Sequence, residues 1–426
     1  MAQIVIIGGG LGGVSAAYEI ATEVRGVPGE HRVTLVSDSD HFEFTPSNPW
    51  VGVGWRKQKD IVIDLAPAMR RRRVDFVASA AEKLEPAQNT LRLANGTTLT
   101  YDQLVIATGP ELAFDEIEGL GPGGYTQSVC KTDHATAANR AFEGFCANPG
   151  PIVVGAVQGA SCFGPAYEYA FMLDTELRKR RIRDRVPITF VSSEPYIGHL
   201  GLDGVGDTKG LLESELRHRH IKWIVSAKVE RVEPGLMHVA EISEDGAPMR
   251  QHEVPFAYAM MLPAFRGVAP LRGVEGLVNP RGFVLVDQFQ RNPTYPNIYG
   301  VGVCVAIPPI GATPVPVGVP KTGFMIETMA HATALNIRSA LQGQPPAARA
   351  SWNALCLADF GDEGVAFVAM PQIPPRNMNW SAQGQWVHTA KVLFERYFLN
   401  KTRRGTTSTF YENFVLKIMG LARLKS

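Results

Sequence analysis

Five cysteines are the residues in this chain best suited to redox chemistry: Cys130, Cys146, Cys162, Cys304 and Cys356. No two of them form a C-x-x-C pair, and none has a Cys or His at zinc-finger spacing, so we expect no structural metal and no disulfide scaffold. Cys162 differs from the others because residues 159–165 read as a turn into a helix. A helix N-terminus stabilises a thiolate, so we expect a lowered pKa for Cys162. Buried cysteines are most often small apolar core residues, and we assign Cys146 and Cys304 to the core.

The element that would hold a cofactor beside these thiols begins at the N-terminus. Four consecutive Ile and Val residues predict a buried parallel strand, and Gly8, Gly10 and Gly13 follow it as G-x-G-x-x-G before a helical pattern. These glycines permit the tight turn, the approach of backbone amides to a pyrophosphate, and the close packing of helix on strand. In this context the motif predicts a dinucleotide-binding unit. The acidic residue expected after the second strand is replaced by Ser37, with Asp38 beside it, and either could bind the ribose.

Two later segments favour FAD as the dinucleotide. A predicted strand ends in Ala-Thr-Gly, with Thr108 and Gly109, and resembles the second fingerprint of flavoproteins that bind two dinucleotides. Residues 297–303, which include Gly302, resemble the strand and turn that return such chains to the flavin. Val303 stands where those proteins usually carry Asp, so backbone groups would have to replace that side chain.

A second unit of the same type starts at Pro151, but its glycine turn is altered. In residues 155–160, Val157 and Ala160 replace the second and third glycines. A valine at the position of close approach keeps a pyrophosphate away. We therefore predict a Rossmann-like domain retained for its architecture, with nicotinamide binding lost.

Composition limits the remaining possibilities. The chain has 426 residues, of which 45% are hydrophobic and 19% charged, with 42 Lys+Arg against 41 Asp+Glu. The balanced charge argues against nucleic-acid binding, and the apolar content argues against disorder. No apolar run approaches the length that spans a bilayer, and we expect no signal peptide. The sequence predicts an α/β fold with a discontinuous FAD-binding domain at 1–112 and 286–345, a second Rossmann-like domain at 113–285, and a C-terminal amphipathic-helix region at 346–426.

The end of the chain is basic and amphipathic. Residues 386–426 contain eight Lys and Arg against two Glu. Apolar stripes at helical spacing run through 386–398 and 410–422, and basic residues flank them or face away. Helices of this kind lie in a membrane interface, which predicts peripheral attachment. Packing of the stripes on the body of the protein, or on a second copy of the chain, is the alternative, so a homo-oligomer stays open.

The residues resemble a known family along the whole chain. The most specific segments are 44–54, 159–168, 194–199 and 320–323. They resemble the sulfide:quinone oxidoreductases, especially the bacterial enzymes of acidophilic sulfur and iron oxidisers. The resemblance implies that hydrogen sulfide is oxidised to polysulfide or elemental sulfur at the cell inner membrane and that a membrane quinone, ubiquinone or a relative, is reduced.

The resemblance also implies roles for the thiols. Cys130, Cys162 and Cys356 match three essential cysteines, and a disulfide or sulfur bridge would join Cys162 and Cys356 above the flavin. Sulfide would attack this bridge by thiol–disulfide exchange, and the freed thiolate would pass two electrons to the flavin. Cys130 would assist sulfur transfer. His134 and His199 match positions where a histidine could relay protons.

Further residues are assigned by the same resemblance. The additional flavin-binding candidates are Pro46, Ala80, Lys321, Thr322 and Gly323. Lys321 would stabilise negative charge on the reduced flavin. The quinone-binding candidates are Phe394 and Tyr411, which would enclose the ring, and Lys391, which would support proton delivery.

Two other functions remain to be weighed. A type II NADH:quinone dehydrogenase would share the two-domain fold and the tail, but the altered second glycine turn and the three placed cysteines argue against it. A non-catalytic flavoprotein that docks on membranes as a redox sensor is the alternative from a different class.

Overall fold

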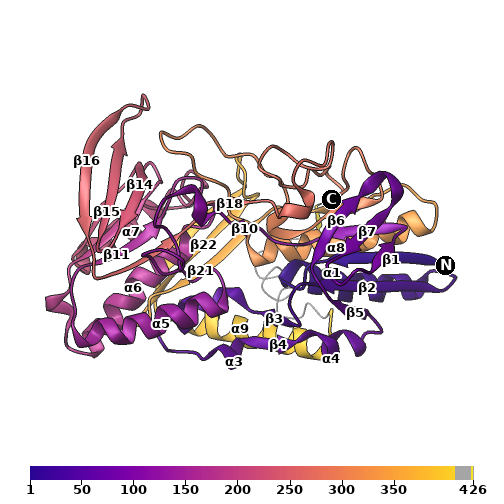
Figure 1. Cartoon of the computed structure of the whole chain (residues 1–426), viewed down its shortest axis with the longest axis horizontal. Helices are drawn as coiled ribbons and strands as arrows, with labels where there is room; N and C mark the ends of the chain where they lie inside the picture. The colour runs from indigo at the N-terminus through magenta and orange to yellow at the C-terminus, as the bar shows by residue number, and fades with distance from the viewer. Residues whose placement is uncertain (408–423, 426) are drawn as a thin grey trace.

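The computed structural model describes residues 1–407 and 424–425. The first of its two units contains a parallel sheet of strand order β19-β9-β1-β2-β5 (Figure 1). The strands are β1 (Ala2–Ile7), β2 (His31–Ser37), β5 (Asp75–Ala78), β9 (Gln103–Ile106) and β19 (Ile298–Gly300). Ile4 lies opposite Val33 on one side and Gln103 on the other. The apolar run of β1 and its burial fit a strand that is covered on both faces.

Helices α1 (Leu11–Glu23) and α8 (Gly323–Leu341) pack together against this sheet. Three small helices follow the second strand: α2 (Asn48–Gly52), α3 (Gln58–Ile61) and α4 (Leu65–Arg70). Two small antiparallel sheets complete this part, one of β3 (His41–Glu43) and β4 (Val62–Asp64), the other of β6 (Ala81–Glu85), β7 (Thr90–Leu93) and β8 (Thr98–Thr100).

The second unit contains a four-stranded parallel sheet of order β13-β12-β11-β17. Its strands are β11 (Ile152–Ala156), β12 (Ile188–Ser192), β13 (Ile221–Ile224) and β17 (Tyr258–Leu262). The associated helices are α5 (Thr132–Ala147), α6 (Gly164–Lys179) and α7 (Thr208–His218). An antiparallel sheet of β14 (Ala227–Glu233), β15 (Leu236–Ile242) and β16 (Pro248–Pro255) stands at the end of the molecule farthest from the first sheet (Figure 1).

The chain crosses between the two parts beside a short antiparallel pair, β10 (Glu111–Leu112) with β18 (Phe265–Arg266). The five-stranded sheet therefore takes its strands from residues 2–106 and 298–300, and the four-stranded sheet from 152–262. The predicted domain boundaries at 112 and 286 fall outside both sheets. One continuous buried cluster runs through both sheets, so the two units share a core.

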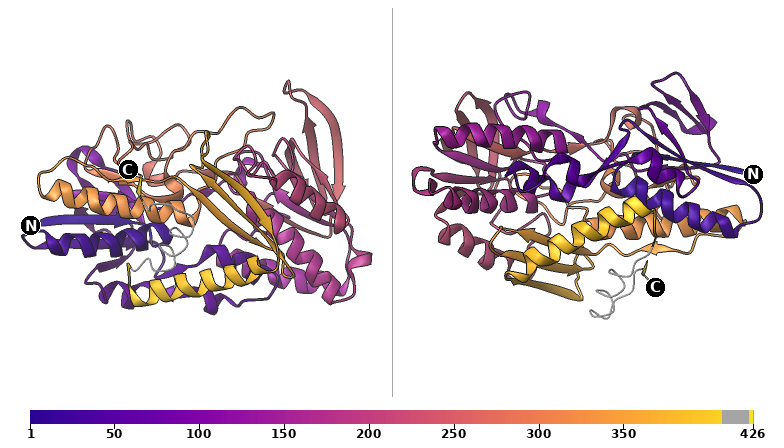
Figure 2. Two further views of the ribbon diagram at one scale, coloured as in Figure 1. Left: turned by 180° about the vertical axis from the view of Figure 1, so that it is seen from behind. Right: turned by 90° about the horizontal axis from the view of Figure 1, so that it is seen from below.

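The C-terminal region begins with an antiparallel sheet of β21 (Ala354–Asp359), β22 (Gly364–Met370) and β23 (Met378–Gln383). A further pair joins β20 (Arg349–Ala350) to β24 (Leu424–Lys425). Helix α9 (Trp386–Arg404) packs on β21 and runs along the lower edge of the molecule, beneath both units (Figures 1 and 2). It ends at Gly405, whose φ of +64° suits a glycine C-cap.

The burial of helix α9 contradicts the expectation that the whole apolar stripe of residues 386–398 lies in a membrane interface. Val387 and Phe398 are buried, whereas Trp386 and Leu393 are about half exposed, at 49% and 48%. Most of this stripe thus packs on the body of the protein, as the alternative held. Lys391 is also buried instead of facing water. The second stripe, 410–422, lies outside the described residues, and none of the described helices is long and apolar enough to cross a membrane.

Candidate active site

The glycine turn after β1 leaves room for a ligand at one position. A Cβ on Gly8 would lie 2.3 Å from the Ala107 carbonyl oxygen, and a Cβ on Gly13 would lie 1.8 Å from the Gly8 carbonyl oxygen. These two glycines therefore serve the packing of strand and helix. A Cβ on Gly10 would meet no atom within 4 Å. Gly10 precedes the first residue of α1, so this open space lies where a helix N-terminus can bind a pyrophosphate.

Helix α8 begins beside α1. The Thr322 hydroxyl caps α8 by accepting a hydrogen bond from the Met325 amide at 3.5 Å. A Cβ on Gly323 would lie 3.4 Å from Leu11, in the first turn of α1. Two helix N-termini therefore face the same region, and their backbone amides favour negative charge there. These features are compatible with the predicted dinucleotide site, which stays a prediction.

Lys321 lies just before this second helix. Its Nζ atom is 5.0 Å from the centre of the Phe283 ring. Burial lowers the pKa of Lys321 to about 8, and the neighbouring thiols of Cys304 and Cys162 oppose that shift. Lys321 is thus close to Cys162 and Cys304 as well as to the start of α8. A buried cation in this position can neutralise an anion formed nearby.

The other cofactor candidates follow the carboxyl ends of β9 and β19 in the five-stranded sheet. Gly109 has a φ of +66° and open space around its Cβ position, and Gly302 has a φ of +87°. The Thr108 hydroxyl donates to the Gly109 carbonyl at 3.1 Å. Cys304 donates to the Ile106 carbonyl at 3.2 Å, which fits the core role expected for it.

The residues that could contact the adenosine end differ in exposure. Ser37 is buried at the end of β2, and its hydroxyl accepts from the Ser39 amide at 3.2 Å. Asp38 is exposed. Ala80 is half-buried after β5, and Pro46 is exposed in the 3-10 turn Thr45–Ser47. Ser37 touches the glycine turn, since a Cβ on Gly9 would lie 2.5 Å from its hydroxyl oxygen.

The fold brings together three cysteines that are far apart in the sequence. Cys162 lies in the loop between β11 and α6, Cys356 on β21, and Cys130 just before α5. The Cys356 sulfur would lie 3.9 Å from a Cβ on Gly164, the first residue of α6. Cys356 and Cys130 both act electrostatically on the Cys162 thiol. All three are free thiols here, so the bridge implied between Cys162 and Cys356 is not formed in this structure.

The predicted lowering of the Cys162 pKa is wrong for the free thiol in this structure. Burial raises the pKa of Cys162 and that of Cys356 to about 12 each, and that of Cys130 to about 11. Helix α6 begins only at Gly164, so Cys162 lies before its first turn, and the dense protein around the thiols disfavours charge. Lys321 opposes this effect on Cys162 without overcoming it.

Glu168, which lies one turn along α6 from Gly164, is a further residue of this site that was not predicted from the sequence. Its carboxylate forms a buried ion pair with the Lys391 ammonium and accepts from the Asp359 amide at 3.1 Å. Burial raises the pKa of Glu168 to about 7, and the Lys391 charge opposes that rise. Glu168 also acts on the thiols of Cys162 and Cys356. A signal was available, since Glu168 is the only charged residue in the otherwise apolar and aromatic stretch 166–173.

Hydrogen bonds continue from this pair toward the surface. The Asp359 carboxylate accepts from the Trp50 indole at 2.7 Å and contacts the His388 ring nitrogen at 3.0 Å. The His388 side chain is 42% exposed. The Lys391 ammonium also lies 5.0 Å from the centre of the Trp50 ring. Titratable groups thus reach from the buried ion pair to water.

Phe394 lies where the C-terminal helix meets the start of α8. Its ring centre is 6.0 Å from that of Phe44 and 4.8 Å from that of Phe398. A Cβ on Gly323 would lie 3.9 Å from the Phe394 ring. Phe394 and Lys391 are therefore both on α9, close to the proposed cofactor site. Tyr411, the other predicted quinone contact, lies outside the described residues.

The two histidine candidates are placed apart from each other. His134 is in the first turn of α5, near Cys130, and its buried Nδ1 has no hydrogen-bond partner within the described part of the chain. His199 is buried, and its Nδ1 accepts from the Gly201 amide at 3.2 Å. Burial lowers the pKa of both rings.

The altered glycine turn of the second unit is covered by another segment of the chain. The Gly159 amide donates to the Pro316 carbonyl at 2.7 Å, and the Gly318 amide donates to the Ala160 carbonyl at 2.8 Å. Val157 is buried in the core of this unit. A dinucleotide would have to displace the segment 316–318, which favours the predicted loss of nicotinamide binding.

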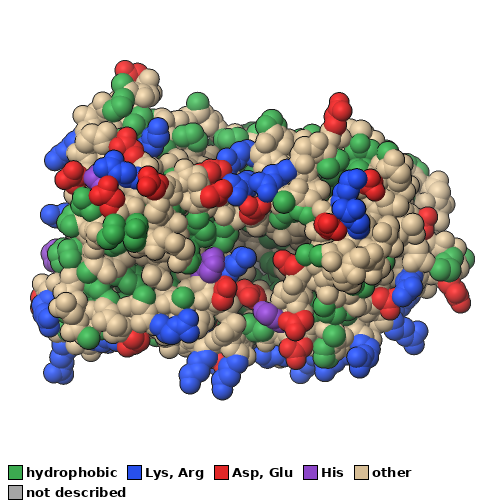
Figure 3. Space-filling model, in the orientation of Figure 1, with side chains coloured by type: hydrophobic (Ala, Val, Ile, Leu, Met, Phe, Trp, Pro, Cys, Tyr) green, Lys and Arg blue, Asp and Glu red, His purple; other side chains and the backbone are tan. Residues whose placement is uncertain are grey.

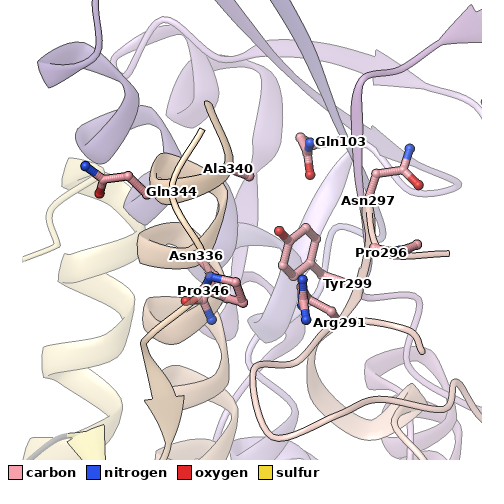
Figure 4. Close-up of a pocket in the computed structure, with 9 residues that line it drawn as sticks. All are labelled: Gln103, Arg291, Pro296, Asn297, Tyr299, Asn336, Ala340, Gln344 and Pro346. Carbon is pink, nitrogen blue, oxygen red and sulfur yellow. The ribbon is translucent and has the colours of Figure 1, made fainter. Parts of the chain in front are cut away.

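A separate cavity of about 260 Å³ lies by the amino ends of β9 and β19 in the five-stranded sheet (Figure 4). It is lined by Gln103 at the start of β9 and by Asn297 just before β19. The glycine turn follows the other end of β1, which runs parallel to both strands. The cavity is therefore distinct from the dinucleotide site. Within the described residues, no cluster of His, Cys, Asp and Glu could hold a metal ion.

Comparisons with known proteins agree with this geometry. Residues 2–334 match the family model described as pyridine nucleotide-disulphide oxidoreductase. The sulfide-quinone reductase of Aquifex aeolicus is 42% identical over 98% of this chain and 94% of its own. The mitochondrial sulfide:quinone oxidoreductase of Mus musculus is 23% identical over 72% of this chain and 66% of its own.

Solved structures give the same result. The crystal structure of the Aquifex aeolicus sulfide:quinone oxidoreductase superposes with a TM-score of 0.93, covering 100% of this chain and 96% of that one. NDH2 from Plasmodium falciparum has a TM-score of 0.71 at 14% identity, which shows a shared fold alone. The protein is a flavin-dependent oxidoreductase of the pyridine nucleotide-disulphide oxidoreductase family, and within that family the chain belongs to the sulfide-quinone reductases.

Proposed function

We propose that this protein oxidises sulfide at Cys162 and Cys356 and passes the electrons through FAD to a membrane quinone. The observation that carries the proposal is the meeting of these two thiols at the start of α6, with Lys321 close to both the thiols and the dinucleotide site. The Aquifex aeolicus relative that is 42% identical over nearly the whole chain is a sulfide-quinone reductase.

The sulfur chemistry needs an oxidised pair at the start. Sulfide, as HS⁻, attacks the Cys162 sulfur of a Cys162–Cys356 disulfide, so that a new S–S bond forms and the bond to Cys356 breaks. Cys162 then carries a persulfide and Cys356 a thiolate. The Cys356 thiolate can then bond to the terminal sulfur and re-form a bridge. That oxidation would release two electrons and the persulfide proton, and a bound flavin would be the group that takes up the electrons. Repeated attack lengthens the sulfur chain until it is released as polysulfide, and Cys130 can accept sulfur during release.

When bound, FAD supplies a carrier that takes two electrons from sulfur and returns them to quinone. We assign its pyrophosphate to Gly8, Gly10 and Gly13 at the start of α1. We assign its ring to the start of α8, where the Lys321 ammonium can balance negative charge. Thr108, Gly109 and Gly302 border the same site, and Ser37 is the better placed ribose ligand because it touches the glycine turn.

The quinone side is assigned to α9. Phe394 provides an aromatic face beside Gly323, and Tyr411 is the second ring expected there. Lys391, held by Glu168, can donate protons to the reduced quinone, and Asp359 and His388 lie between this ion pair and water. Ubiquinone or a related quinone of the inner membrane is the proposed acceptor, with the protein attached peripherally.

Substitution at Gly10 tests the FAD assignment. Gly10→Ala adds a methyl group that meets no protein atom at a φ of −80°, so the chain should fold normally. The methyl group would occupy space next to the pyrophosphate, so we expect FAD to bind at least about tenfold more weakly, a loss of at least ~1.4 kcal/mol. Fluorescence titration of the stripped protein with FAD measures this. Gly13→Ala is the contrasting variant, because its methyl group would clash with the Gly8 carbonyl and disturb the fold itself. Normal FAD affinity in Gly10→Ala would refute the assignment.

A donor comparison tests the function. Purified protein is assayed with a short-chain ubiquinone analogue and either sulfide or NADH as the electron donor. We expect sulfide-dependent quinone reduction and no reduction with NADH, because residues 316–318 cover the second glycine turn. NADH oxidation without sulfide oxidation would instead identify an NADH:quinone dehydrogenase.

A further inference from the structure

Another cavity, of about 650 Å³, lies in the second unit, and we call it the basic cavity. Its lining consists of four arginines, two histidines and one aspartate: Arg178, Arg181, Arg183, Arg219, His218, His220 and Asp184. These residues come from the C-terminal ends of α6 and α7 and from the segments that lead into β12 and β13. The basic cavity therefore lies by the amino ends of these strands, whereas the altered glycine turn follows the carboxyl end of β11.

The chain around this cavity is strongly basic. Residues 178–185 contain six Lys and Arg against one Asp, and residues 217–220 add two Arg and two His. The end of the molecule formed by the second unit, at the left of Figure 3, shows Lys, Arg and His side chains along its edge. Asp184, which is exposed, is the one carboxylate among the described residues that line the cavity. Positive charge gathered in this way attracts anions.

A buried carboxylate holds the arginines of one wall. The side chain of Asp174 is fully buried and accepts from Arg178 at 2.7 Å and from Arg219 at 3.2 Å. Arg183 donates to the same carboxylate, and Arg219 also pairs with Glu215 at 3.1 Å. Arg178 uses only its Nε atom, so its two terminal nitrogens have no partner among the described residues, and its side chain is 47% exposed. The wall is thus preformed and leaves the Arg178 donors available to a ligand.

Two of the lining residues occupy backbone positions that favour glycine. Arg181 lies two residues beyond the end of α6 and His220 two residues beyond the end of α7. Their φ angles are +58° and +52°. A side chain is disfavoured in this left-handed conformation, which is why glycine is common just after a helix end. Backbone geometry therefore does not explain why both helices carry a large polar side chain here, beside the same cavity.

Stabilisation of the helix ends does not account for these side chains either. Cations near a helix C-terminus are favourable, but the last turns already contain Lys179 in α6 and Arg217 in α7. The side chains of Arg181, His218 and His220 make no hydrogen bond or ion pair within the part of the chain that the structure describes. Donors on two walls of the cavity are therefore available to an external anion.

We propose that the basic cavity binds a diphosphate group, either free or as part of a nucleotide. Arg178 and Arg181 stand at the end of α6, and His218 and His220 at the end of α7, so two linked phosphate groups could contact both walls. A guanidinium binds phosphate oxygens through two parallel hydrogen bonds, and an imidazole donates from a ring N–H. The cavity volume falls within the range of about 300–1,000 Å³ that is usual for small-molecule sites. This site is separate from the sulfur and flavin sites and does not depend on the proposed function.

Isothermal titration calorimetry of the full-length, flavin-loaded protein tests the proposal with inorganic phosphate, pyrophosphate and ADP as probes. We expect pyrophosphate to bind more tightly than inorganic phosphate, because only a diphosphate reaches both walls. Tighter binding of ADP than of pyrophosphate would identify a nucleotide as the ligand class, and equal or weaker binding of ADP would identify a free diphosphate. Binding of none of the three probes, or equal binding of phosphate and pyrophosphate, would overturn the proposal.

Glycine variants separate ligand binding from a structural role. Arg181→Gly and His220→Gly, combined, suit the left-handed backbone and remove both side chains, so the melting temperature should not fall. The affinity for pyrophosphate should fall roughly a hundredfold, about tenfold for each hydrogen-bonding side chain lost. Asp184→Asn should instead strengthen binding, because it removes the carboxylate from the lining.

Arg73→Gly is the matched control. Arg73 is likewise an exposed arginine with a φ of +58°, but it follows α4 in the first unit. Its glycine variant should bind pyrophosphate as the wild type does. Unchanged pyrophosphate affinity in the double glycine variant, with or without a lower melting temperature, would overturn the proposal and assign the two side chains to the helix ends.

Discussion

Replacement of Cys162 or Cys356 with serine is expected to abolish sulfide-driven quinone reduction. Serine cannot form the S–S bonds through which sulfide is oxidised, so kcat should fall by at least about 10³-fold, as when a catalytic nucleophile is removed. Steady-state assays with a soluble quinone measure the loss. The flavin should remain bound, because the glycine turn and the start of α8 are untouched. The yellow absorption of the purified variants reports this.

Cys146→Ser supplies the matched control. Cys146 lies near the end of α5, is half-buried, and is not among the residues that act on the Cys162 thiol. Its serine variant should keep full activity. Cys130→Ser should be impaired less than the other two, because Cys130 neighbours the pair without belonging to the proposed bridge. A Cys356→Ser enzyme as active as the Cys146→Ser enzyme would rule out the proposed sulfur bridge.

The second large effect is expected for Glu168→Gln. Glutamine cannot hold the Lys391 ammonium as an ion or take up its proton, so we expect the transfer of electrons from flavin to quinone to slow by about 10²-fold. Reduction of the flavin by sulfide should change much less. Stopped-flow measurement of the two half-reactions separates these outcomes. Equal slowing of both would contradict a role of Glu168 on the quinone side alone.

The same variant should change how stability depends on pH. The pKa of Glu168 is raised to about 7 in the folded protein, whereas a glutamate in an unfolded chain has a pKa of about 4.3. Between these values the folded state binds more protons than the unfolded state, so this carboxyl makes the free energy of unfolding decrease as pH rises. Glu168→Gln should flatten that part of the profile, as urea unfolding across this pH range would show. A slope identical to that of the wild type would contradict the assignment.

The partner residue provides a rescue for this prediction. Glu168→Gln alone leaves a buried ammonium without a carboxylate, which costs about 3–5 kcal/mol. Adding Lys391→Met removes that charge and should recover most of the stability without recovering quinone reduction. Recovery of the activity together with the stability would show that the ion pair serves folding alone.

Local features of the fold could be predicted from the sequence because they depend on neighbouring residues. The run of Ile and Val before Gly8 specifies a buried strand, and the spacing of Gly8, Gly10 and Gly13 specifies the turn that follows. The substitution at Val157 likewise indicated a turn without its usual ligand, and the structure shows another segment bonded across it.

Properties that depend on tertiary burial could not be predicted in this way. The pKa of Cys162 follows from the protein packed around the thiol, which the local helix start does not reveal. The local sequence assigns Lys391 to the quinone side only by resemblance and does not show its burial, which depends on Glu168, more than two hundred residues earlier, lying opposite it. The meeting of Cys162 with Cys356 was available only from the family resemblance, since neither residue carries a local sign of the other.

Anaerobic titration of the oxidised protein with sulfide, in the absence of quinone, tests the central claim most directly. We expect sulfide to bleach the flavin absorption in the wild type and to leave it unchanged in a variant with both Cys162 and Cys356 replaced by serine. Bleaching of equal extent and rate in that double variant would contradict the account, because electrons would then reach the flavin without the thiol pair.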